Sequence, residues 1–325
     1  MNLGIKISLT SAVVAVLGTA AFSEDFDWRK FEGTEITWAY DIHPYADAVV
    51  TYLDEFEELT GITVNVELYP DDTYWGKLNI QLSTGSSDWD VVGTGIQPAW
   101  DVTPGGQLTP LRGLIEDSSM TNPNYDYEDF FPALRRAWTW DVAEEEIIDN
   151  VDGEVWGIPH AFENMQLMYR TDILKRLGVK PPSTLPELTE ACAKITAADP
   201  NITPMAVRGV RFWSSIHTAP ISIAKSYGVS DFVRSGENLD TALDSDASFR
   251  FHTDYVAMIQ ACAPDSWAND NWYQVVDGLS TGKTAMAMDA NMFGFWNNIE
   301  GASDASGKIA FAPPLTAPDN DEFAS

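Results

Sequence analysis

The pattern of apolar and polar residues changes its period several times along the first part of the chain. Apolar residues alternate with polar ones at 36–40 and 62–68, which predicts two strands. Between these runs, apolar residues recur at helical spacing over 46–60 and predict a single helix. A second helix is expected at 75–85 and a buried strand at 89–92. This strand–helix–strand–helix–strand order is typical of a parallel sheet that is covered by helices.

Similar patterns begin again after residue 163. Thr184 and Glu187 have the spacing of a capping box, so they predict the start of a helix that continues through Ile195. The other elements predicted in this half are strands at 165–169, 205–207, 285–288 and 308–315, and helices that end at 178, begin near 214, and span 252–263 and 272–279.

The loops that follow the predicted strands are the first candidates for a binding site. In open α/β sheets, ligands bind beyond the carboxyl ends of the strands. The loops 41–44 and 94–101 follow two strands of the first half. We therefore expect polar and aromatic residues in these loops to face a ligand.

The first 23 residues have the three parts of a signal peptide. Lys6 is the only charged residue among them, the run 7–21 is apolar, and Ala21-Phe22-Ser23 is a small-x-small cleavage site. The apolar run is shorter than the roughly 20 residues that a membrane-spanning helix requires. No cysteine near the cleavage site could carry a lipid anchor. We therefore expect an exported, periplasmic protein that begins near Glu24 after cleavage.

The chain is strongly acidic. It contains 49 Asp and Glu against 19 Lys and Arg, which gives a net charge of −30. Such a surface repels nucleic acids and anionic membranes, and it favours a neutral or cationic small molecule as ligand. The chain also contains 12 Trp and 11 Tyr. Tryptophan usually lies in cores, but amphipathic rings also stack on sugars.

The two cysteines, Cys192 and Cys262, lie on the apolar stripes of two predicted helices. An exported protein can form disulfides, so a bond between them is one interpretation. Buried free thiols are the other. The sequence does not give the Cα separation that would decide between them.

Motifs of nucleotide-binding and catalytic sites are weak in this sequence. The run 278–284 resembles a phosphate-binding loop, but Asp277 stands where its first glycine should be. The order of elements is also reversed, because a helix is predicted before this run and a strand after it. The sequence has no His-Glu-x-x-His, Gly-x-Ser-x-Gly or Gly-x-Gly-x-x-Gly motif, and its four histidines lack metal-ligand spacing. We therefore expect no metal and no cofactor; the absence of catalytic residues is implied only by the family resemblance described below.

A segment near the middle of the chain resembles a known family. Gly153-Glu-Val-Trp-Gly-Ile-Pro159 is followed by Glu163, by an extended run that ends at Tyr169, and by a helix that ends at Gly178 before Pro181-Pro182. This order and spacing resembles the central signature of the family 1 extracellular solute-binding proteins, the receptors of ABC sugar importers. Mild departures occur further along: Arg170 stands where the family usually has Asn, and Leu185-Pro186 where it has Trp-Asp.

The resemblance covers nearly all of 34–315, and it implies an α/β fold of the periplasmic-binding-protein type, with two lobes joined by hinge strands (type II). Family members continue beyond the strand that corresponds to 309–314, so we expect parts of both lobes to be missing from this sequence. The expected division is a signal peptide at 1–23, a first lobe at 24–163, a second lobe at 164–309, and a return to the first lobe at 310–325.

The resemblance also implies a ligand site. Glu163 stands where family members place a sugar-contacting acid, at the crossing between the lobes. The other candidates follow predicted strands or offer an aromatic face. They are Asp41, His43, Gln97, Trp100, Arg208, Trp213, Trp272, Asp289 and Asn291.

The implied function is that of a monomeric periplasmic protein, not an enzyme, that captures a neutral sugar or sugar alcohol and delivers it to the permease subunits of an ABC importer. Two alternatives stay open at this point. A secreted carbohydrate-active enzyme needs two carboxylates that face each other across a cleft, and the sequence does not exclude such a pair. A receptor for another small solute, such as a polyamine or a peptide, would have a similar fold.

Overall fold

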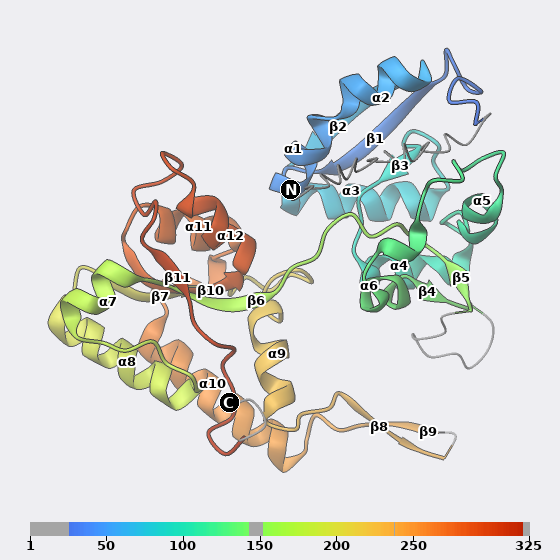
Figure 1. Cartoon of the computed structure of the whole chain (residues 1–325). Coiled ribbons are helices and arrows are strands. Elements are labelled where there is room, and N and C mark those ends of the chain that lie inside the picture. Colours follow the sequence, from blue (N-terminus) through green and yellow to red (C-terminus); the bar gives the residue numbers. More distant parts are fainter. Residues whose placement is uncertain (1–25, 143–151, 237, 321–325) are drawn as a thin grey trace, which may run out of the picture. The chain divides into compact units, whose positions relative to one another are not determined.

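A computed structural model describes residues 26–142, 152–236 and 238–320 of the chain (Figure 1). The chain divides into two compact units, Met1–Ala161 and Phe162–Ser325. The division lies two residues before the predicted end of the first lobe, at residue 163. The predicted signal peptide falls outside the described residues. Among the described residues, no helix is both long and apolar enough to cross a membrane.

The first unit is built on a parallel sheet of three strands. The order is β2-β1-β3, and Trp38 at the centre of β1 pairs with Val66 on one side and Val91 on the other. The strands are β1 (Glu35–Asp41), β2 (Thr63–Tyr69) and β3 (Val91–Val92), and the helices between them are α1 (Pro44–Val50), α2 (Leu53–Thr60) and α3 (Asp71–Thr84). The predicted strand–helix order and the parallel pairing are confirmed.

Two details of this unit differ from the sequence predictions. The single helix expected at 46–60 is broken into α1 and α2 at Thr51-Tyr52, where the Tyr52 amide bonds to the Val49 carbonyl in a turn. The strand expected to be buried at 89–92 is a short edge strand, and Val91 is 48% exposed. β3 pairs with β1 over only two residues, and among the described strands none pairs with its other edge.

The rest of the first unit consists of short helices and a two-stranded antiparallel ribbon. Its elements are α4 (Ile96–Val102), η1 (Thr103–Gly105), α5 (Arg112–Glu116), η2 (Tyr127–Asp129), α6 (Pro132–Ala137), β4 (Thr139–Trp140) and β5 (Glu154–Val155).

The second unit has a mixed sheet in the order β11-β6-β10-β7. β10 is parallel to β7, and β6 is antiparallel to both β10 and β11. The strands of this sheet are β6 (Met165–Arg170), β7 (Thr203–Val207), β10 (Thr284–Ala290) and β11 (Ile309–Phe311). The helices are α7 (Thr171–Leu177), α8 (Leu185–Ala198), α9 (Thr218–Ser226), α10 (Asp246–Cys262), η3 (Trp267–Asn269), α11 (Trp272–Ser280) and α12 (Asn291–Asn298).

Helices cover both faces of this second sheet, with α11 and α12 on one side and α8 and α10 on the other (Figure 1). Met286 and Met288 belong to the core shared with α8 and α10, whereas Ala287 packs with Leu279 of α11. All seven residues of β10 are buried. This alternation is what a central strand requires when both of its faces are covered.

Cys192 and Cys262 form a disulfide that joins α8 to α10, with a Cα–Cα distance of 5.1 Å. Both side chains are completely buried. The two helices pack closely along their apolar stripes, so the positions that the sequence suggested for buried thiols are also within bonding distance of each other. The structure therefore decides between the two interpretations of these cysteines.

Several element boundaries in the second unit also differ from the predictions. α9 begins at Thr218 and not near 214, and α10 begins at Asp246, after the Ser245 cap, and not at 252. The strand predicted at 308–315 is reduced to Ile309–Phe311, because Pro313 and Pro314 have no amide hydrogen to donate.

The segment that follows β11 was expected to return to the first lobe, and this prediction is wrong for the described residues 310–320. The Ala312 amide bonds to the Leu167 carbonyl, the Thr316 amide to the Ser183 carbonyl, and the Ala317 amide to Ser226 Oγ. All of these partners lie in the second unit. The pairing of β11 with β6 directs the chain along this unit's own sheet.

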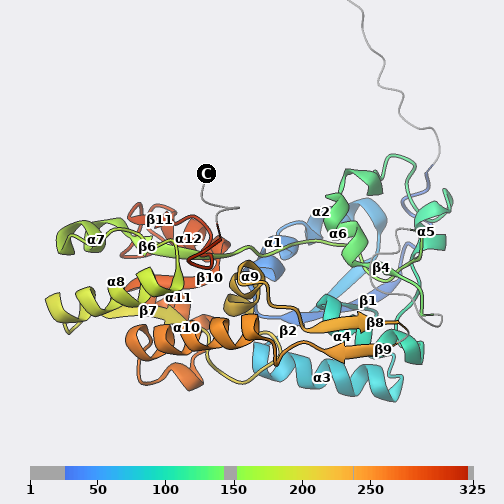
Figure 2. The same cartoon turned by 90° about the horizontal axis from the view of Figure 1, so that it is seen from below.

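A two-stranded hairpin, β8 (Phe232–Ser235) with β9 (Asn238–Thr241), leads into α10 (Figure 2). All eight strand residues are exposed. The hairpin adds nothing to the buried core of its unit.

Candidate functional site

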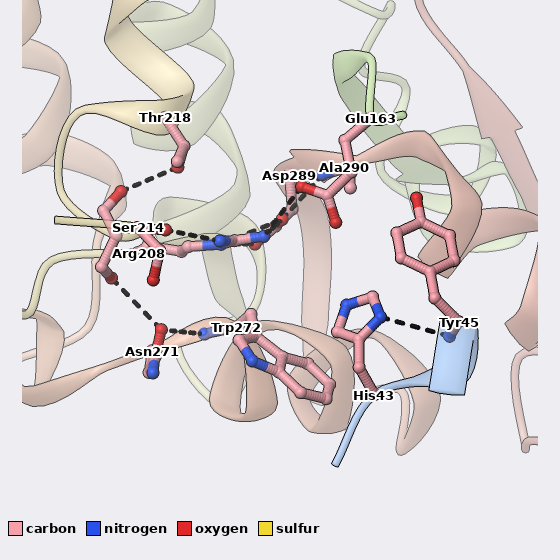
Figure 3. A network of polar contacts seen from close by, with 11 residues as sticks. His43, Tyr45, Glu163, Arg208, Ser214, Thr218, Asn271, Trp272, Asp289 and Ala290 are labelled. Carbon is pink, nitrogen blue, oxygen red and sulfur yellow. Dashed lines mark hydrogen bonds and ion pairs between the residues drawn. The ribbon is translucent and has the colours of Figure 1, made fainter. Parts of the chain in front are cut away.

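The main polar cluster of the second unit lies where its strand ends meet. Arg208 directly follows β7, and Asp289 is the penultimate residue of the parallel strand β10. Glu163 precedes β6, which is antiparallel to β10, so Met165 pairs with Ala290 at the same edge of the sheet. Three residues that are far apart in the sequence are therefore brought together by the sheet (Figure 3).

Arg208 is held by hydrogen bonds on two sides of its guanidinium. Its Nε donates to Asp289 Oδ2 at 2.9 Å and to Oδ1 at 3.1 Å, and its Nη2 also donates to Oδ1. Its Nη1 donates to the Ser214 carbonyl at 2.7 Å. Asp289 Oδ1 also accepts from the Ala290 amide at 2.7 Å. This bidentate arrangement fixes the plane of the guanidinium.

Glu163 forms the outer layer of this cluster. Its Oε2 lies 3.8 Å from Arg208 Nη2. The exposed fraction of the side chain rises from 0% for Asp289 to 5% for Arg208 and 25% for Glu163. The three charges therefore form a layered network, in which Asp289 lies deepest and Glu163 has the most access to a ligand.

A second polar group surrounds the start of α11. Asn271 caps this helix in a capping box with Gln274, and its Oδ1 accepts from the Trp272 amide at 2.9 Å and from Ser215 Oγ at 3.3 Å. Gly209, directly after Arg208, packs so closely on Trp267 that any Cβ there would collide with its carbonyl oxygen. These contacts hold the segment that follows Arg208 in one conformation.

The remaining predicted residues of the second unit have different surroundings. Trp272 is buried and stacks on Phe293, with ring centroids 5.3 Å apart and planes within 5° of parallel. Trp213 is half-buried beside Phe212. Asn291 Nδ2 lies 3.5 Å from Gln166 Oε1, and its amide bonds to the Asn164 carbonyl. Trp272 thus packs as a core residue.

In the first unit, aromatic rings gather at the carboxyl end of β1. His43 follows this strand and caps α1, since its Nδ1 accepts from the Tyr45 amide at 3.3 Å (Figure 3). The ring of His160 lies edge-on to Tyr40 and Tyr45, at 5.6 and 6.1 Å. Desolvation lowers the pKa of His160, so this imidazole is neutral at physiological pH. Asp41, the last residue of β1, is buried.

The two candidates on α4 lie on a more exposed part of the first unit. Gln97 is exposed, and Trp100 is 42% exposed. The Trp100 ring lies edge-on to Trp140 at 6.4 Å, and Trp140 also contacts Trp138 and Trp156. Trp100 is therefore the exposed member of a cluster of four indole rings.

Sequence reasoning missed His160 and Ser214. His160 follows a Gly/Pro turn, and only its position after β5 could have suggested it. Ser214 contributes a backbone carbonyl, which any residue could supply. The signal for such a contact is not in the residue type.

Each unit also has a surface cavity. The cavity of the first unit has a volume of about 460 Å³, and that of the second about 400 Å³. In the first, Arg112 pairs with Glu116 and Arg135 with Glu128. None of the ten predicted ligand-binding residues lines either cavity. Among the described residues, no group of three or more His, Cys, Asp or Glu is placed to hold a metal ion.

The matches to known families and to curated proteins agree with each other. The profile of the bacterial extracellular solute-binding protein family matches residues 51–324. The erythritol/L-threitol-binding protein of Mycolicibacterium smegmatis is 31% identical over 303 residues. These residues are 93% of this chain but only 63% of that protein, so the chain spans less than two thirds of this relative's length.

Solved structures show the same fold. An ABC transporter solute-binding protein from Agrobacterium vitis, with bound D-mannitol, has a TM-score of 0.71 at 22% identity, over 87% of this chain and 64% of that one. A second, from Agrobacterium radiobacter in complex with ribitol, has a TM-score of 0.74 at 18% identity, over 89% of this chain and 68% of that one. These likenesses confirm the predicted fold class, a two-lobe α/β fold of the periplasmic-binding-protein type.

Proposed function

Because the chain belongs to the bacterial extracellular solute-binding proteins, we propose that it captures a polyol or a neutral sugar and delivers it to the permease of an ABC importer. The named relatives support the ligand class, since they bind erythritol, L-threitol, D-mannitol or ribitol. The signal-peptide pattern of the first 23 residues and the family support an exported, periplasmic protein, and we propose that it acts as a monomer.

The observation that carries this proposal is the layered network of Glu163, Arg208 and Asp289. Hydroxyl groups of a polyol both donate and accept hydrogen bonds. A carboxylate such as Glu163 accepts from them, and a guanidinium such as Arg208 donates to them, in charge-assisted bonds that are stronger than neutral ones. A few such bonds, with an aromatic face, are enough for the roughly −8 kcal/mol of a micromolar complex.

The buried position of Asp289 argues against a glycosidase built on Glu163 and Asp289. A glycosidase needs two carboxyl groups that flank the scissile bond. Asp289 is 0% exposed and is bonded through both oxygens to Arg208, so it cannot act on a substrate. We assign to Asp289 the role of positioning Arg208, and to Glu163 that of direct contact with ligand.

The proposal is tested by a ligand screen on the exported protein. Thermal shifts are measured against alditols of four to six carbons, hexoses, disaccharides and polyamines, followed by calorimetric titration of the best ligand. We expect an alditol or a monosaccharide to raise the melting temperature and to bind with a Kd of about 1 μM. Preferential binding of a polyamine, or release of product from an oligosaccharide, would contradict the proposal.

Two single variants test whether the Trp213 ring contributes to ligand binding. Trp213→Ala should weaken binding by about 1 kcal/mol, through the loss of stacking on the C–H face of the ligand. Trp296→Ala is the control, because Trp296 is a 43% exposed ring on α12 of the same unit. Equal effects of the two substitutions would show that Trp213 does not contact the ligand.

A further inference from the structure

The charged network of the second unit has an arrangement that bears on the charge of its ligand. Glu163 and Asp289 carry two negative charges around the single positive charge of Arg208, so the network has a formal excess of one negative charge. The cation is turned inward, with a side chain only 5% exposed, whereas the carboxylate of Glu163 is the most exposed of the three.

The Nε/Nη2 edge of Arg208, which suits a bidentate contact, faces an acceptor of the protein itself. An arginine binds a carboxylate or phosphate most strongly through two parallel N–H donors. In this protein the Nε/Nη2 edge already holds Asp289 in that way, and Nη1 donates to the Ser214 carbonyl. An anionic ligand would have to compete with a buried carboxylate that the fold places in direct contact with Arg208.

The histidine next to this network supplies no compensating charge. Desolvation and the nearby charge of Arg208 both lower the pKa of His217. This imidazole is therefore neutral at physiological pH and adds no positive charge beside Arg208.

We propose that Glu163, backed by the Arg208–Asp289 pair, makes the site selective for charge: it accepts neutral polyols and their amino derivatives, and it rejects the corresponding aldonates and polyol phosphates. The inference rests on the proposed function, since it concerns the same ligand site. An added ammonium group forms a charge-assisted bond with Glu163, whereas an added carboxylate meets a like charge at close range.

The overall charge of the chain offers a different origin for the same selectivity. A net charge of −30 repels every anion at long range. That repulsion is screened by salt, with a Debye length of about 30 Å at 0.01 M and about 8 Å at 0.15 M, whereas a contact at the site is screened much less. Salt dependence and a matched charge variant therefore separate the two origins.

The experiment compares three ligands of equal carbon number: the alditol that binds best in the screen, its aldonate, and its 1-amino-1-deoxy derivative. Titration calorimetry gives the Kd of each for the wild type at about 0.02 and 0.5 M salt. We expect the aldonate to bind at least about 100-fold more weakly than the alditol at both salt concentrations. The amino derivative should bind as tightly as the alditol or more tightly.

Two variants assign the effect to its residue. Glu163→Gln should reduce the discrimination against the aldonate to about 10-fold or less, because it removes the like charge and keeps the shape. Glu163→Asp keeps the charge and should keep the discrimination. Glu190→Gln is the matched control, since it removes the same charge from an exposed position on α8, where Glu190 lies 3.9 Å from Lys194.

The possible results distinguish a failure of the charge selectivity from a failure of the proposed function. If the alditol and the aldonate bind the wild type equally, the charge selectivity is overturned while the proposed function stands. If Glu190→Gln changes the discrimination as much as Glu163→Gln does, or if salt abolishes it, the assignment to Glu163 is wrong. If no neutral polyol or sugar binds at all, the proposed function fails and this inference fails with it. Melting temperatures of all variants confirm that they are folded.

Discussion

The polar clusters of the two units are built from different chemistry. In the second unit, hydrogen-bonded charges surround Arg208, and both partners that fix its guanidinium lie in the same buried framework. In the first unit, the residues at the end of β1 contact one another mainly through rings, as His160 does with Tyr40 and Tyr45. Ring contacts of this kind are weaker and less directional than charge-assisted bonds.

The sheets of the two units also differ in how completely they are covered. Every residue of β10 is buried between two layers of helices, and a disulfide joins two of the helices on one side. In the first unit, Val66 of β2 is 38% exposed and Val91 of β3 is 48% exposed. A charge network needs a rigid frame, because a buried ion pair is stabilising only when its geometry is held. The second unit therefore combines the stronger polar network with the more completely covered sheet.

The largest expected effect is the loss of the buried cation. Arg208→Met leaves Asp289 buried without its partner, and we expect the free energy of unfolding of the second unit to fall by about 3–5 kcal/mol. Urea unfolding measures the loss, and hydrogen exchange assigns it to one unit. The exposed Arg211→Met is the control, with an expected change below about 0.5 kcal/mol.

The double variant Arg208→Met/Asp289→Leu sharpens this test. It removes both charges, so most of the lost stability should return, although ligand binding should not. If the double variant is as unstable as Arg208→Met, the cost comes from packing and not from an unpaired charge. In that case the contrast between the two units would rest on their cores alone.

The disulfide should give the next largest effect, again confined to the second unit. Replacing Cys192 and Cys262 by Ala removes a cross-link that closes a sequence separation of 70 residues. The expected loss is about 2–4 kcal/mol. Hydrogen exchange should rise in α8 and α10 and stay unchanged at β1. A reductant should destabilise the wild type and leave the double variant unaffected; a change in the first unit would contradict the separation.

A substitution in the first unit tests its smaller hydrogen-bonded core. Tyr74 is completely buried, and its hydroxyl donates to the Gly93 carbonyl at 2.6 Å and lies 3.1 Å from the Ala39 carbonyl. Tyr74→Phe leaves both carbonyls without this partner and should cost about 1–2 kcal/mol. Tyr52→Phe is the control, because Tyr52 is 68% exposed. Equal costs would show that this hydroxyl adds nothing to the core.

Tyr74 should also make the free energy of unfolding depend on pH in alkaline solution. Burial raises the pKa of Tyr74 well above its ordinary value of 10.0. The folded state therefore keeps this proton at a pH where the unfolded state has lost it. The stabilising contribution is complete below about pH 10 and decreases as the pH rises further. Tyr74→Phe should flatten this decrease in urea unfolding between about pH 9 and 11; an unchanged slope would contradict the assignment.

Local signals in the sequence predicted the elements well. Gly61 and Gly178 end α2 and α7 with φ values of 71° and 66°, as the predicted helix ends require. The order of strands and helices in the first unit follows from hydrophobic spacing, because each element buries one face. Such features depend on a few neighbouring residues and can therefore be recognised without a structure.

Features that depend on distant pairing were harder to predict. The edge position of β3 and the place of the segment after β11 follow from which strands pair, and the sequence does not encode this locally. The family resemblance placed Arg208, Glu163 and Asp289 in one site, and the structure brings these three together. The family resemblance does not reveal that Asp289 is completely buried, deeper than Arg208. That depth depends on the surrounding helices.

The smallest expected effect concerns a helix cap in the second unit. Thr184 caps α8, where its Oγ1 accepts from the Glu187 amide at 3.3 Å. The Glu187 carboxylate accepts from the amide and hydroxyl of Ser183, at 2.8 and 2.7 Å, and these bonds lower its pKa. Thr184 thus makes the hydrogen bond that the predicted capping box requires of it. The bond from the Glu187 carboxylate goes to Ser183, one residue before the expected partner Thr184. Thr184→Ala should reduce stability by about 1 kcal/mol at neutral pH.

Measurements in acid distinguish the contribution of Thr184 to this cap from that of Glu187. Because the pKa of Glu187 is lowered in the folded state, its contribution is present above the ordinary value of 4.5 and is lost as the pH falls through the folded value. The hydroxyl of Thr184 does not titrate, so the cost of Thr184→Ala should persist in acid, whereas the cost of Glu187→Gln should decrease. Thr51→Ala at the exposed end of α1 is the control from the first unit. Urea unfolding at about pH 7 and pH 3.5 measures all three. A cost of Glu187→Gln that does not decrease in acid would show that the carboxylate stabilises α8 by packing and not by its charge.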